Sequence, residues 1–414
     1  MCRSWKHLAG LLCVCGALLM GAYGQTLTWL GTLTPTGGRS AAYGASNDGM
    51  MVVGQANGYA AVWNRQTSTI TQVYASSYLI AVAADGSKAV GFWGSYPDQR
   101  AFMWTPPNNF QWLPPAPSFC WAVDITPSGS HAVGKARSPS GNNLPAVWEL
   151  NTNPPLVHTY AVPGDMYLGE AYGISDDART VVAFGHGNRW GYKGVVFRLN
   201  SDGSVAAWAF LNPVSGHYGC VPREVSGDGT IAVGNTGNFW GGSYYPVMWR
   251  EVNNWQPEQP AHLGGNAGEA FDIRGDVIVG FSSLPNGQYR AVRWNVATAT
   301  TQVEDLNQTY AALLGNGSVL AMALGLSPNG RFIVGEGYNA ATGRYEAFLL
   351  DTQVCASHNG DVDESGCVDD ADLLAVLFAF GQSGQALGRV DANCDGVVDD
   401  ADLLIVLFSF GSGC

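Results

Sequence analysis

Charged side chains are scarce in this sequence. Only 13% of the 414 residues are Asp, Glu, Lys or Arg, and 20 basic residues stand against 33 acidic ones, which gives a net charge of −13. No basic cluster is present, so the composition excludes a nucleic-acid-binding protein. Catalytic signatures are missing as well: there is no Gly-x-Ser-x-Gly elbow, His-Glu-x-x-His, phosphate-binding glycine loop or Cys-x-x-Cys pair. We therefore expect binding rather than catalysis.

Long apolar runs are missing after the N-terminus. At the start of the chain, Arg3 and Lys6 precede an uncharged stretch over residues 8–23, which closes with small residues at Ala22 and Gly24. A short apolar run behind basic residues, ending in a small-x-small site, is typical of a secretory signal peptide. We therefore predict a signal peptide over residues 1–24, a secreted protein that is extracellular or on the cell surface, and no membrane span in the mature chain.

Cysteine is sparse in the body of the chain. Six of the nine cysteines lie after the predicted signal peptide. Cys120 and Cys220 are far apart along the sequence, and we expect buried thiols there rather than a disulfide. The other four lie near the C-terminus and allow two disulfides in three pairings, between which the sequence does not choose. These four are Cys355, Cys367, Cys394 and Cys414.

Between the signal peptide and the C-terminal region, one motif recurs seven times. Each copy has a stretch of small residues, a tight turn of the type Ser-x-Asp-Gly, a Val-Val-Gly strand and, in most copies, a strand that contains Trp. The glycines of the Val-Val-Gly strands mark the period. From Gly54 to Gly335 there are six intervals, 281/6 or about 47 residues each. This period suits one four-stranded blade of a β-propeller.

The strands of each unit follow from the motif. The small-residue stretch is strand a, nearest the crowded axis; Val-Val-Gly is strand b; the Trp segment is strand c; and a weaker segment such as Ile70–Val73 or Thr301–Val303 is strand d. The seventh unit lacks strand d, and the N-terminal segment Leu27–Leu33 is a spare strand. We therefore predict an all-β fold over residues 25–352, a seven-bladed β-propeller closed by its N-terminal strand.

These units and their opening segment, Leu30-Gly31-Thr32-Leu33, resemble the HAF family of extracellular repeats. The resemblance covers roughly residues 26 to 351. It implies secretion and little about activity.

Aromatic residues fall into two groups in the predicted propeller. Trp63, Trp104, Trp148, Trp249 and Trp294 recur at one register of strand c, as residues packed between blades do. Other rings gather in the variable b-to-c hairpins, which we expect on one face, opposite the Asp-Gly turns. Rings and amides there suit a neutral polysaccharide, and the same rings also serve to stabilise long Gly-rich loops. The candidate ligand-binding residues are Trp93, Tyr96, Trp190, Tyr192, Trp240, Tyr244 and Tyr245.

The C-terminal region holds most of the charge and a duplicated acidic loop. Residues 355–414 contain eleven acidic residues against Arg389, which gives −10 of the −13. A twelve-residue loop begins at Asp361 and again at Asp391, thirty positions later. Both copies have oxygen-bearing side chains at positions 1, 3, 5, 9 and 12 and Gly at position 6, as a hard cation of high coordination number requires. The pattern predicts two Ca²⁺ sites.

Each loop runs into an apolar, helix-like segment, at residues 373–380 and 403–410, and no helix precedes it. This arrangement, with Asp at position 12, resembles the type I dockerin, a duplicated calcium module that docks onto cohesin domains, over about residues 358 to 413. The resemblance implies a small α-helical module over residues 353–414, with a cohesin-like or other surface protein as partner. By likeness, the calcium ligands are Asp361, Asp363, Ser365, the Cys367 carbonyl, Asp369 and Asp372, then Asp391, Asn393, Asp395, the Val397 carbonyl, Asp399 and Asp402.

The module departs from the dockerin pattern in the character of its two helices. Dockerins usually carry polar or basic residues on the helix face that meets cohesin, whereas both segments here are almost wholly apolar. Because apolar helices are normally buried, we expect the two to pack on each other and on a further surface, either the preceding domain or a partner. In addition, Ser365 stands where the second loop has Asp395, so the first loop should bind calcium more weakly.

The sequence leaves three functions open. One is a secreted propeller that binds an extracellular glycan or surface protein and is carried by the calcium-dependent module. Another is a glycoside hydrolase or lyase that uses carboxylates near the axis, which need closeness in space and not in sequence. The third is a structural cell-surface repeat protein whose module mediates assembly. The axial carboxylates are Asp124, Glu224, Asp272 and Glu269, with backbone groups or Arg223 as their alternative partners; we interpret Arg274-Gly275-Asp276 as a blade turn.

Overall fold

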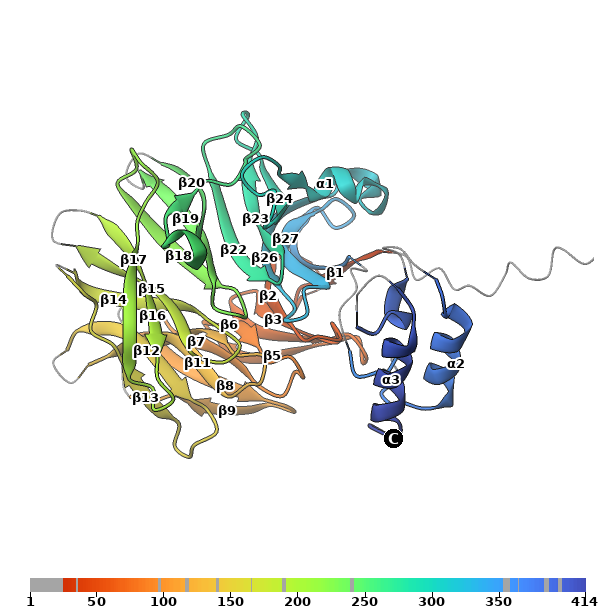
Figure 1. The fold of residues 1–414 in the computed structure, drawn as a ribbon. Coiled ribbons are helices and arrows are strands. Elements are labelled where there is room, and N and C mark those ends of the chain that lie inside the picture. The colour runs from red at the N-terminus through yellow and green to blue at the C-terminus, as the bar shows by residue number, and fades with distance from the viewer. Residues whose placement is uncertain are drawn as a thin grey trace, which may run out of the picture.

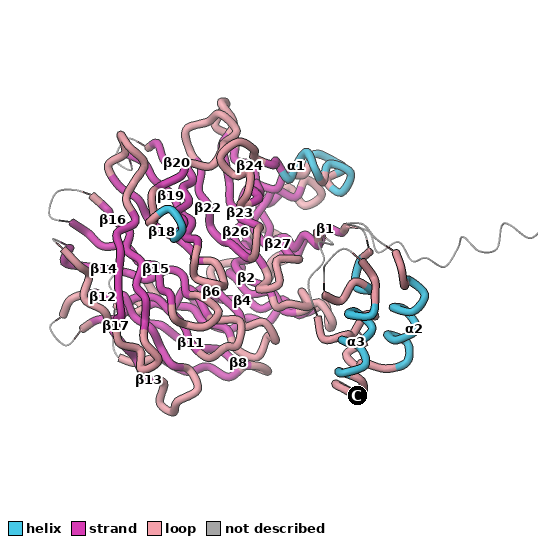
Figure 2. The backbone as a smooth tube through the Cα atoms, viewed as in Figure 1, coloured by secondary structure: helices cyan, strands magenta, loops and turns pink. Residues whose placement is uncertain are grey.

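A computed structural model describes residues 25–34, 36–95, 98–115, 119–138, 141–164, 166–187, 191–238, 242–352, 358–363, 365–382, 387–393 and 397–414. The predicted signal peptide, residues 1–24, lies outside these ranges. The strands form seven four-stranded antiparallel sheets arranged around one axis, which makes a seven-bladed β-propeller (Figure 1). Strands dominate residues 25–352, whereas two helices form the C-terminal module (Figure 2).

Six blades run from strand a to strand d in chain order. The first blade consists of β2 (Ser40–Ala45), β3 (Met51–Ala56), β4 (Tyr59–Asn64) and β5 (Thr69–Ala75). The second consists of β6 (Ser77–Val82), β7 (Ala89–Trp93), β8 (Arg100–Thr105) and β9 (Asn109–Trp112). The third consists of β10 (Trp121–Ile125), β11 (His131–Arg137), β12 (Asn143–Glu149) and β13 (Leu156–Thr159). The fourth blade consists of β14 (Met166–Ile174), β15 (Thr180–Gly187), β16 (Tyr192–Leu199) and β17 (Val205–Leu211). The fifth consists of β18 (Gly219–Val225), β19 (Ile231–Asn238), β20 (Ser243–Arg250) and β21 (Pro257–Glu258). The sixth consists of β22 (Gly268–Arg274), β23 (Val277–Ser283), β24 (Tyr289–Asn295) and β25 (Glu304–Asp305).

The seventh blade joins the two ends of the propeller. It consists of β26 (Val319–Leu326), β27 (Phe332–Asn339), β28 (Arg344–Asp351) and, as its outer strand, β1 (Thr26–Gly31). β1 pairs antiparallel with β28, with Thr26 opposite Asp351 and Trp29 opposite Phe348. The predicted closure by the N-terminal strand is therefore confirmed.

One strand lies later than predicted. In the sixth blade we expected strand d at Thr301–Val303, but the ladder with β24 is made by β25 (Glu304–Asp305). The amides of Thr301 and Gln302 both donate to the carbonyl of Thr298, so a turn uses the groups that a strand would need. β25 then leads directly into α1 (Leu306–Thr309).

The core of the propeller is divided among the blade interfaces. Each pair of adjacent blades shares one cluster of buried apolar residues within the described chain. The cluster between the first and seventh blades, for example, joins Val52 and Trp63 to Phe332 and Leu349. Because every blade buries both faces against its neighbours, the Val-Val-Gly strands are apolar throughout and not alternating.

The strand-c tryptophans are packing residues. All five are at most 3% exposed. The indole Nε1 of Trp249 donates to the Asn212 carbonyl at 2.8 Å, and that of Trp294 donates to the Ala261 carbonyl at 2.7 Å. Both carbonyls lie on the connection that enters the same blade. These rings therefore fill the interface and fix the path of the d-to-a connection.

The C-terminal module contains α2 (Asp370–Ala379) and α3 (Asp400–Ser409), which pack on each other. Val376 and Val406 are fully buried between them, with Val368 and Val398 alongside. A disulfide joins Cys367 to Cys414, which is one of the pairings that the sequence allowed. Cys355 and Cys394 lie outside the described residues. Cys120 and Cys220 are buried thiols, as predicted.

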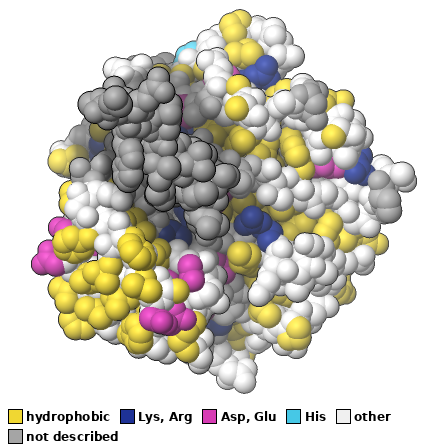
Figure 3. Space-filling model, turned by 90° about the vertical axis from the view of Figure 1, so that its right-hand side faces the viewer, with side chains coloured by type: hydrophobic (Ala, Val, Ile, Leu, Met, Phe, Trp, Pro, Cys, Tyr) yellow, Lys and Arg dark blue, Asp and Glu magenta, His cyan; other side chains and the backbone are white. Residues whose placement is uncertain are grey.

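The expected packing of the two helices on each other is confirmed, and burial of their outer side against a further surface stays a prediction. Each helix presents a matching set of large apolar side chains to solvent, and Phe378 and Phe408 are 83% and 85% exposed. We call this set the apolar helix face. Figure 3 shows hydrophobic side chains gathered beside acidic ones on the side of the molecule that carries the module. The apolar helix face consists of Leu374, Leu377 and Phe378 of α2 and Leu404, Leu407 and Phe408 of α3.

No helix within the described residues is both long and apolar enough to cross a bilayer.

Candidate functional sites

The first acidic loop folds so that its carboxylates converge. Oxygen atoms of Asp361, Asp363 and Asp372 all lie within 4.8 Å of one another. The position-1 carboxylate, Asp361, accepts hydrogen bonds from the amides of Ser365 and Gly366 at 3.1 Å each, which bends the loop around it. Three acidic groups held this close repel one another unless a cation lies between them. The donor set of the first loop thus fits a hard divalent cation.

The described part of the second loop repeats this geometry. In the first loop, Asp372 accepts from the amides of Asp363 at 3.0 Å and Asp369 at 2.9 Å. In the second, Asp402 accepts from Asn393 at 3.0 Å and Asp399 at 2.9 Å. Asp391 is buried. The predicted ligand Asp395 lies outside the described residues, whereas the Val397 backbone is described.

The position-9 aspartates also start the helices. Asp369 and Asp399 are the N-caps of α2 and α3, and each accepts a hydrogen bond from the amide two residues later at 2.8 Å. Asp372 and Asp402 complete a capping box by accepting from the N-cap amide. Loop and helix are therefore built by the same carboxylates, so an ion bound in the loop would also hold the start of the helix.

The aromatic hairpin residues are only partly brought together. Tyr96, Trp190 and Trp240 lie outside the described residues. Tyr192 packs edge-on against His186, with ring centroids 4.9 Å apart. Tyr245 stacks on His217 at 5.7 Å and contacts His262, and Tyr244 contacts Phe281. Within the described chain these rings mainly contact their own neighbours, which is the stabilising role given above as the alternative.

Trp93 instead belongs to an aromatic cluster on the outer part of the first two blades. It contacts Tyr74 of β5 and Trp112 of β9, whose side chains are 42% and 36% exposed. Phe110 stacks on Tyr74 at 5.1 Å, and the Arg100 guanidinium lies 5.6 Å from the Trp112 ring. The d-strand residues Tyr74 and Trp112 were not predicted, because the sequence analysis looked for ligand-binding rings only in the hairpins.

A β-bulge recurs in strand a of all seven blades. At the same position of every strand a, pairing with strand b skips one residue, so this side chain leaves the ladder. The fourth and seventh blades have a second register shift nearer the start of strand a. The seven residues skipped at the common position line one cavity of 340 Å³ at the axis. They are Tyr43, Ile80, Val123, Tyr172, Arg223, Phe271 and Leu324.

The residue after each bulge differs from blade to blade. In four blades it is Gly or Ala, and in the third, fifth and sixth it is Asp124, Glu224 and Asp272. Asp124 accepts from the Ile174 amide at 3.0 Å, and Asp272 accepts from the Leu326 amide at 2.7 Å, each across a blade boundary. Glu224 instead accepts from the amide of Val225 in its own strand, at 2.9 Å. Three of the four predicted axial carboxylates thus line the cavity, and two of them, Asp124 and Asp272, cap the neighbouring strand a.

The fourth axial carboxylate, Glu269, has a different partner. It forms an ion pair with Arg223 and accepts from Asn235 Nδ2 at 2.7 Å. This is the pairing with Arg223 that the sequence analysis gave as the alternative to catalysis. Glu269 therefore joins the fifth and sixth blades and does not line the cavity.

Burial perturbs the cavity carboxylates. It raises the pKa of Asp124 to about 6, because Arg274 only partly offsets the loss of hydration and Asp272 adds a like charge. Burial and the neighbouring Asp124 raise the pKa of Glu224 well above its usual value. Burial also raises the pKa of Tyr43 and of Tyr172, each to about 12, so both phenols stay neutral.

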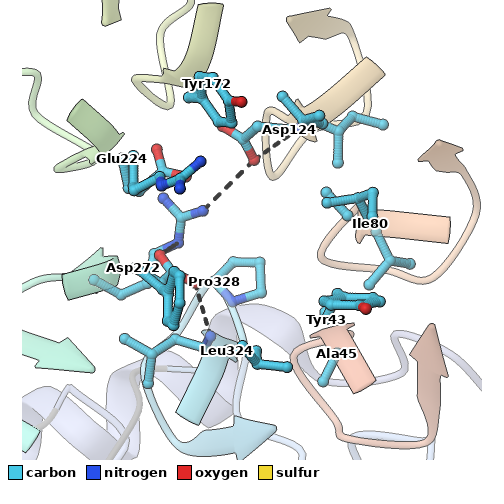
Figure 4. Close-up of a pocket in the computed structure, with 18 of the residues that line it drawn as sticks. Tyr43, Ala45, Ile80, Asp124, Tyr172, Glu224, Asp272, Leu324 and Pro328 are labelled. Carbon is cyan, nitrogen blue, oxygen red and sulfur yellow. Dashed lines mark hydrogen bonds and ion pairs between the residues drawn. The ribbon is translucent and has the colours of Figure 1, made fainter. Parts of the chain in front are cut away.

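Arg274 is the residue whose role the sequence analysis missed. It is 9% exposed, and its guanidinium lies 4.0 Å from Asp124 and 3.6 Å from Asp272 (Figure 4). At the same repeat position the other blades have Ser, Thr or Ala, as at Ser46 and Ser226, where the hydroxyl bonds the turn carboxylate. The turn of the sixth blade is shorter, with Arg274 directly opposite Val277. Aligning the repeats at the bulge would have revealed this substitution.

The sequence matches no known protein family, and no curated protein sequence matches it. Solved structures match at the level of the fold. The β-propeller domain of the trilobed protease from Pyrococcus furiosus is 9% identical with a TM-score of 0.50, covering 76% of this chain and 95% of that one. That propeller is described as having an open velcro topology, whereas here β1 closes the ring.

Two other structures are similar at lower scores. Hydrazine synthase from Kuenenia stuttgartiensis is 15% identical with a TM-score of 0.46, covering 80% of this chain and 98% of that one. TolB from Acinetobacter baumannii is 11% identical with a TM-score of 0.39, covering 71% and 76%. The likeness to the trilobed-protease propeller supports the propeller fold alone, and at such identities the comparisons identify neither a ligand nor an activity.

Proposed function

We propose that this chain is a secreted, non-catalytic binding protein. Its propeller recognises an extracellular glycan or surface protein, and its C-terminal module, which resembles a dockerin, attaches it in a calcium-dependent manner. The observation that carries the proposal is the convergence of Asp361, Asp363 and Asp372 within 4.8 Å in a loop whose twin repeats the same amide contacts. A duplicated cation site of this kind is typical of a calcium-ordered module.

The calcium ions would order the module. The first would be held by Asp361, Asp363, Ser365, Asp369 and Asp372 with the Cys367 carbonyl, and the second by the equivalent set around Asp391 and Asp402. Bound calcium neutralises carboxylates that otherwise repel one another, and these carboxylates also cap α2 and α3. Attachment through the apolar helix face would then depend on calcium, because calcium holds the two helices in place.

A protein is the partner that the apolar helix face fits. Its large side chains, including Phe378 and Phe408, offer no group that bonds a sugar hydroxyl or a phosphate. A cohesin-like or other surface protein with a complementary apolar area would bury them. On the propeller, the cluster of Tyr74, Trp93 and Trp112 offers partly exposed rings on which the flat faces of a polysaccharide can stack.

The test is depletion of the mature chain, residues 25–414, from solution by insoluble polysaccharides in the presence of calcium, with the supernatants assayed for released sugar. Depletion without sugar release, reduced in a Trp112→Ala variant and unchanged in Trp208→Ala, is the expected result. Trp208 is a suitable control because it is 48% exposed on β17, on another blade. Sugar release would contradict the non-catalytic assignment, and no depletion by any polymer would leave only the surface-protein part of the proposal.

A further inference from the structure

The axial cavity has two chemically different sides. Asp124, Glu224 and Asp272, from the third, fifth and sixth blades, form a carboxylate side. The bulge residues of the seventh, first and second blades, Leu324, Tyr43 and Ile80, form an apolar side. Figure 4 shows the carboxylates on one side of the pocket and Tyr43 and Ile80 across from them. At 340 Å³ the space is that of a small-molecule site.

The polar side has hydrogen-bonding groups that the described chain does not satisfy. Asp272 Oδ1 and the Nε and Nη1 atoms of Arg274 are buried and make no hydrogen bond to any described residue. Both residues are more than nine-tenths buried. Their 3.6 Å ion-pair distance is too long for a hydrogen bond. Leaving charged groups buried without hydrogen bonds is costly, so the site is built to receive a polar partner.

The Asp272 and Arg274 atoms that have no hydrogen-bond partner in the described chain determine which chemical class of ligand fits. Asp272 Oδ1 needs a donor, and the Arg274 N–H groups need acceptors. An anion would satisfy Arg274 but would leave Asp272 Oδ1 without a donor. An ammonium group would satisfy Asp272 but offers nothing to Arg274. A hydroxyl group both donates and accepts, so a neutral ligand with adjacent hydroxyls satisfies both residues at once.

From this we infer that the axial cavity binds a single sugar residue. Its hydroxyl edge would bridge Asp272 and Arg274, and its apolar C–H face would lie on the aromatic rings of Tyr43 and Phe271, which line the same cavity. The inference rests on the proposed glycan recognition for the class of ligand. It adds a site at the axis that is separate from the Tyr74, Trp93 and Trp112 cluster.

The repeats supply the matched variants. Arg274→Ser introduces the residue that the first, fourth, fifth and seventh blades have at this position, and Phe271→Leu introduces the Leu of the seventh blade. Trp208→Phe is the control, since Trp208 lies on β17 and outside the cavity. Near-ultraviolet circular dichroism and the melting temperature of each protein verify that it is folded. If Arg274→Ser does not fold, Phe271→Leu alone still tests the site, because it leaves every polar contact in place.

The experiment titrates the calcium-loaded mature chain with free monosaccharides, glycerol and methylammonium, and follows the total tryptophan fluorescence, to which Trp121 in the cavity wall contributes. Saturable binding of at least one monosaccharide is expected, weakened about tenfold in both cavity variants and unchanged in the control. Binding of methylammonium alone, binding of a sugar that both variants retain, or no binding would overturn the inference. If polysaccharide depletes the protein but no free sugar binds, the cavity site is wrong and the proposed glycan recognition stands. If free sugar binds but no polysaccharide depletes the protein, only the cavity site stands.

Discussion

The Arg331 guanidinium binds the Asp351 carboxylate through two hydrogen bonds, Nε to Oδ1 at 2.9 Å and Nη2 to Oδ2 at 2.8 Å. Both side chains are more than 90% buried, and Asp351 pairs through its backbone with Thr26 of β1. The ion pair thus lies where the first and last strands of the propeller meet.

We expect Arg331→Ala to lower the free energy of unfolding by about 3–5 kcal/mol, because it leaves a buried carboxylate unpaired at this seam. Arg293→Ala is the matched control. Arg293 holds Glu304 in the same two-bonded geometry, at 2.8 and 2.9 Å, but both side chains are more exposed. Its loss should cost about 1 kcal/mol or less. Urea denaturation measures the free energy of unfolding of both variants. Equal losses would contradict the expectation that the buried ion pair contributes more than the exposed one.

The indole hydrogen bonds can be separated from the packing of the rings. Trp294→Phe keeps most of the ring but removes the 2.7 Å bond to Ala261, and we expect a loss of about 1–2 kcal/mol in unfolding free energy. Trp63→Phe is the control, since the Trp63 Nε1 has no hydrogen-bond partner in the described chain. Its substitution should cost clearly less in the same thermal or urea assay. A larger loss for Trp63→Phe would show that the lost ring volume, and not the lost hydrogen bond, determines the change in stability.

The raised pKa of Asp124 has a consequence for stability with a definite sign. The native state keeps this proton up to about pH 6, whereas the unfolded chain releases it near pH 4. Between these two pH values the folded state binds more protons than the unfolded chain. Protonated Asp124 therefore contributes to the free energy of unfolding in full below about pH 4, and this contribution is lost as the pH rises through 6.

Asp124→Asn removes this contribution. The variant should therefore lose more stability relative to the original protein at pH 4 than at pH 7, besides the cost of one lost backbone hydrogen bond. Urea denaturation of both proteins at pH 4, 5, 6 and 7 measures the difference, in which the titration of the calcium module cancels. An equal difference at every pH would contradict a raised pKa.

Calcium should stabilise the C-terminal module and not the propeller. We expect chelation to reduce helical circular dichroism and to lower the melting transition of the module, because calcium bound at 100 times its Kd contributes about 2.7 kcal/mol. Asp402→Ala should weaken calcium binding more than Asp372→Ala, because the second loop has a carboxylate, Asp395, at position 5, where the first loop has Ser365. Isothermal titration calorimetry compares them, with magnesium as the control ion. The opposite ranking would contradict the expectation from the position-5 ligand.

The sequence predicted the architecture well because the repeat is regular. The 47-residue period, the missing strand d and the spare N-terminal strand together determine seven blades and their closure. The acidic loops could be located from the sequence as well, because their positions are local; the calcium ions that we expect them to hold stay a prediction. In both cases the information lies within one unit or in the count of units.

The axial site was harder to predict for a physical reason. A bulge in each strand a rotates one side chain out of the ladder, so simple alternation does not say that Tyr43 and Phe271 face the axis. Arg274 was interpreted as part of a turn, because only the pairing with Val277 shows it to be a strand residue. The contacts of Tyr245 with His217 and His262 could not be predicted either, because they depend on neighbours from other segments; ligand binding by the hairpin rings stays a prediction.

The pairing of β1 with β28 also constrains how the chain reaches its native state. Thr26 and Asp351 are opposite each other in the sheet although 325 positions separate them in the sequence. Synthesis from the N-terminus produces β1 first and its partner strand last, after six complete blades. The N-terminal strand must therefore wait for nearly the whole propeller to form. Because such distant contacts slow folding, we expect this closure to be the late, rate-limiting step of maturation, and an unclosed seventh blade to be the species most exposed to aggregation.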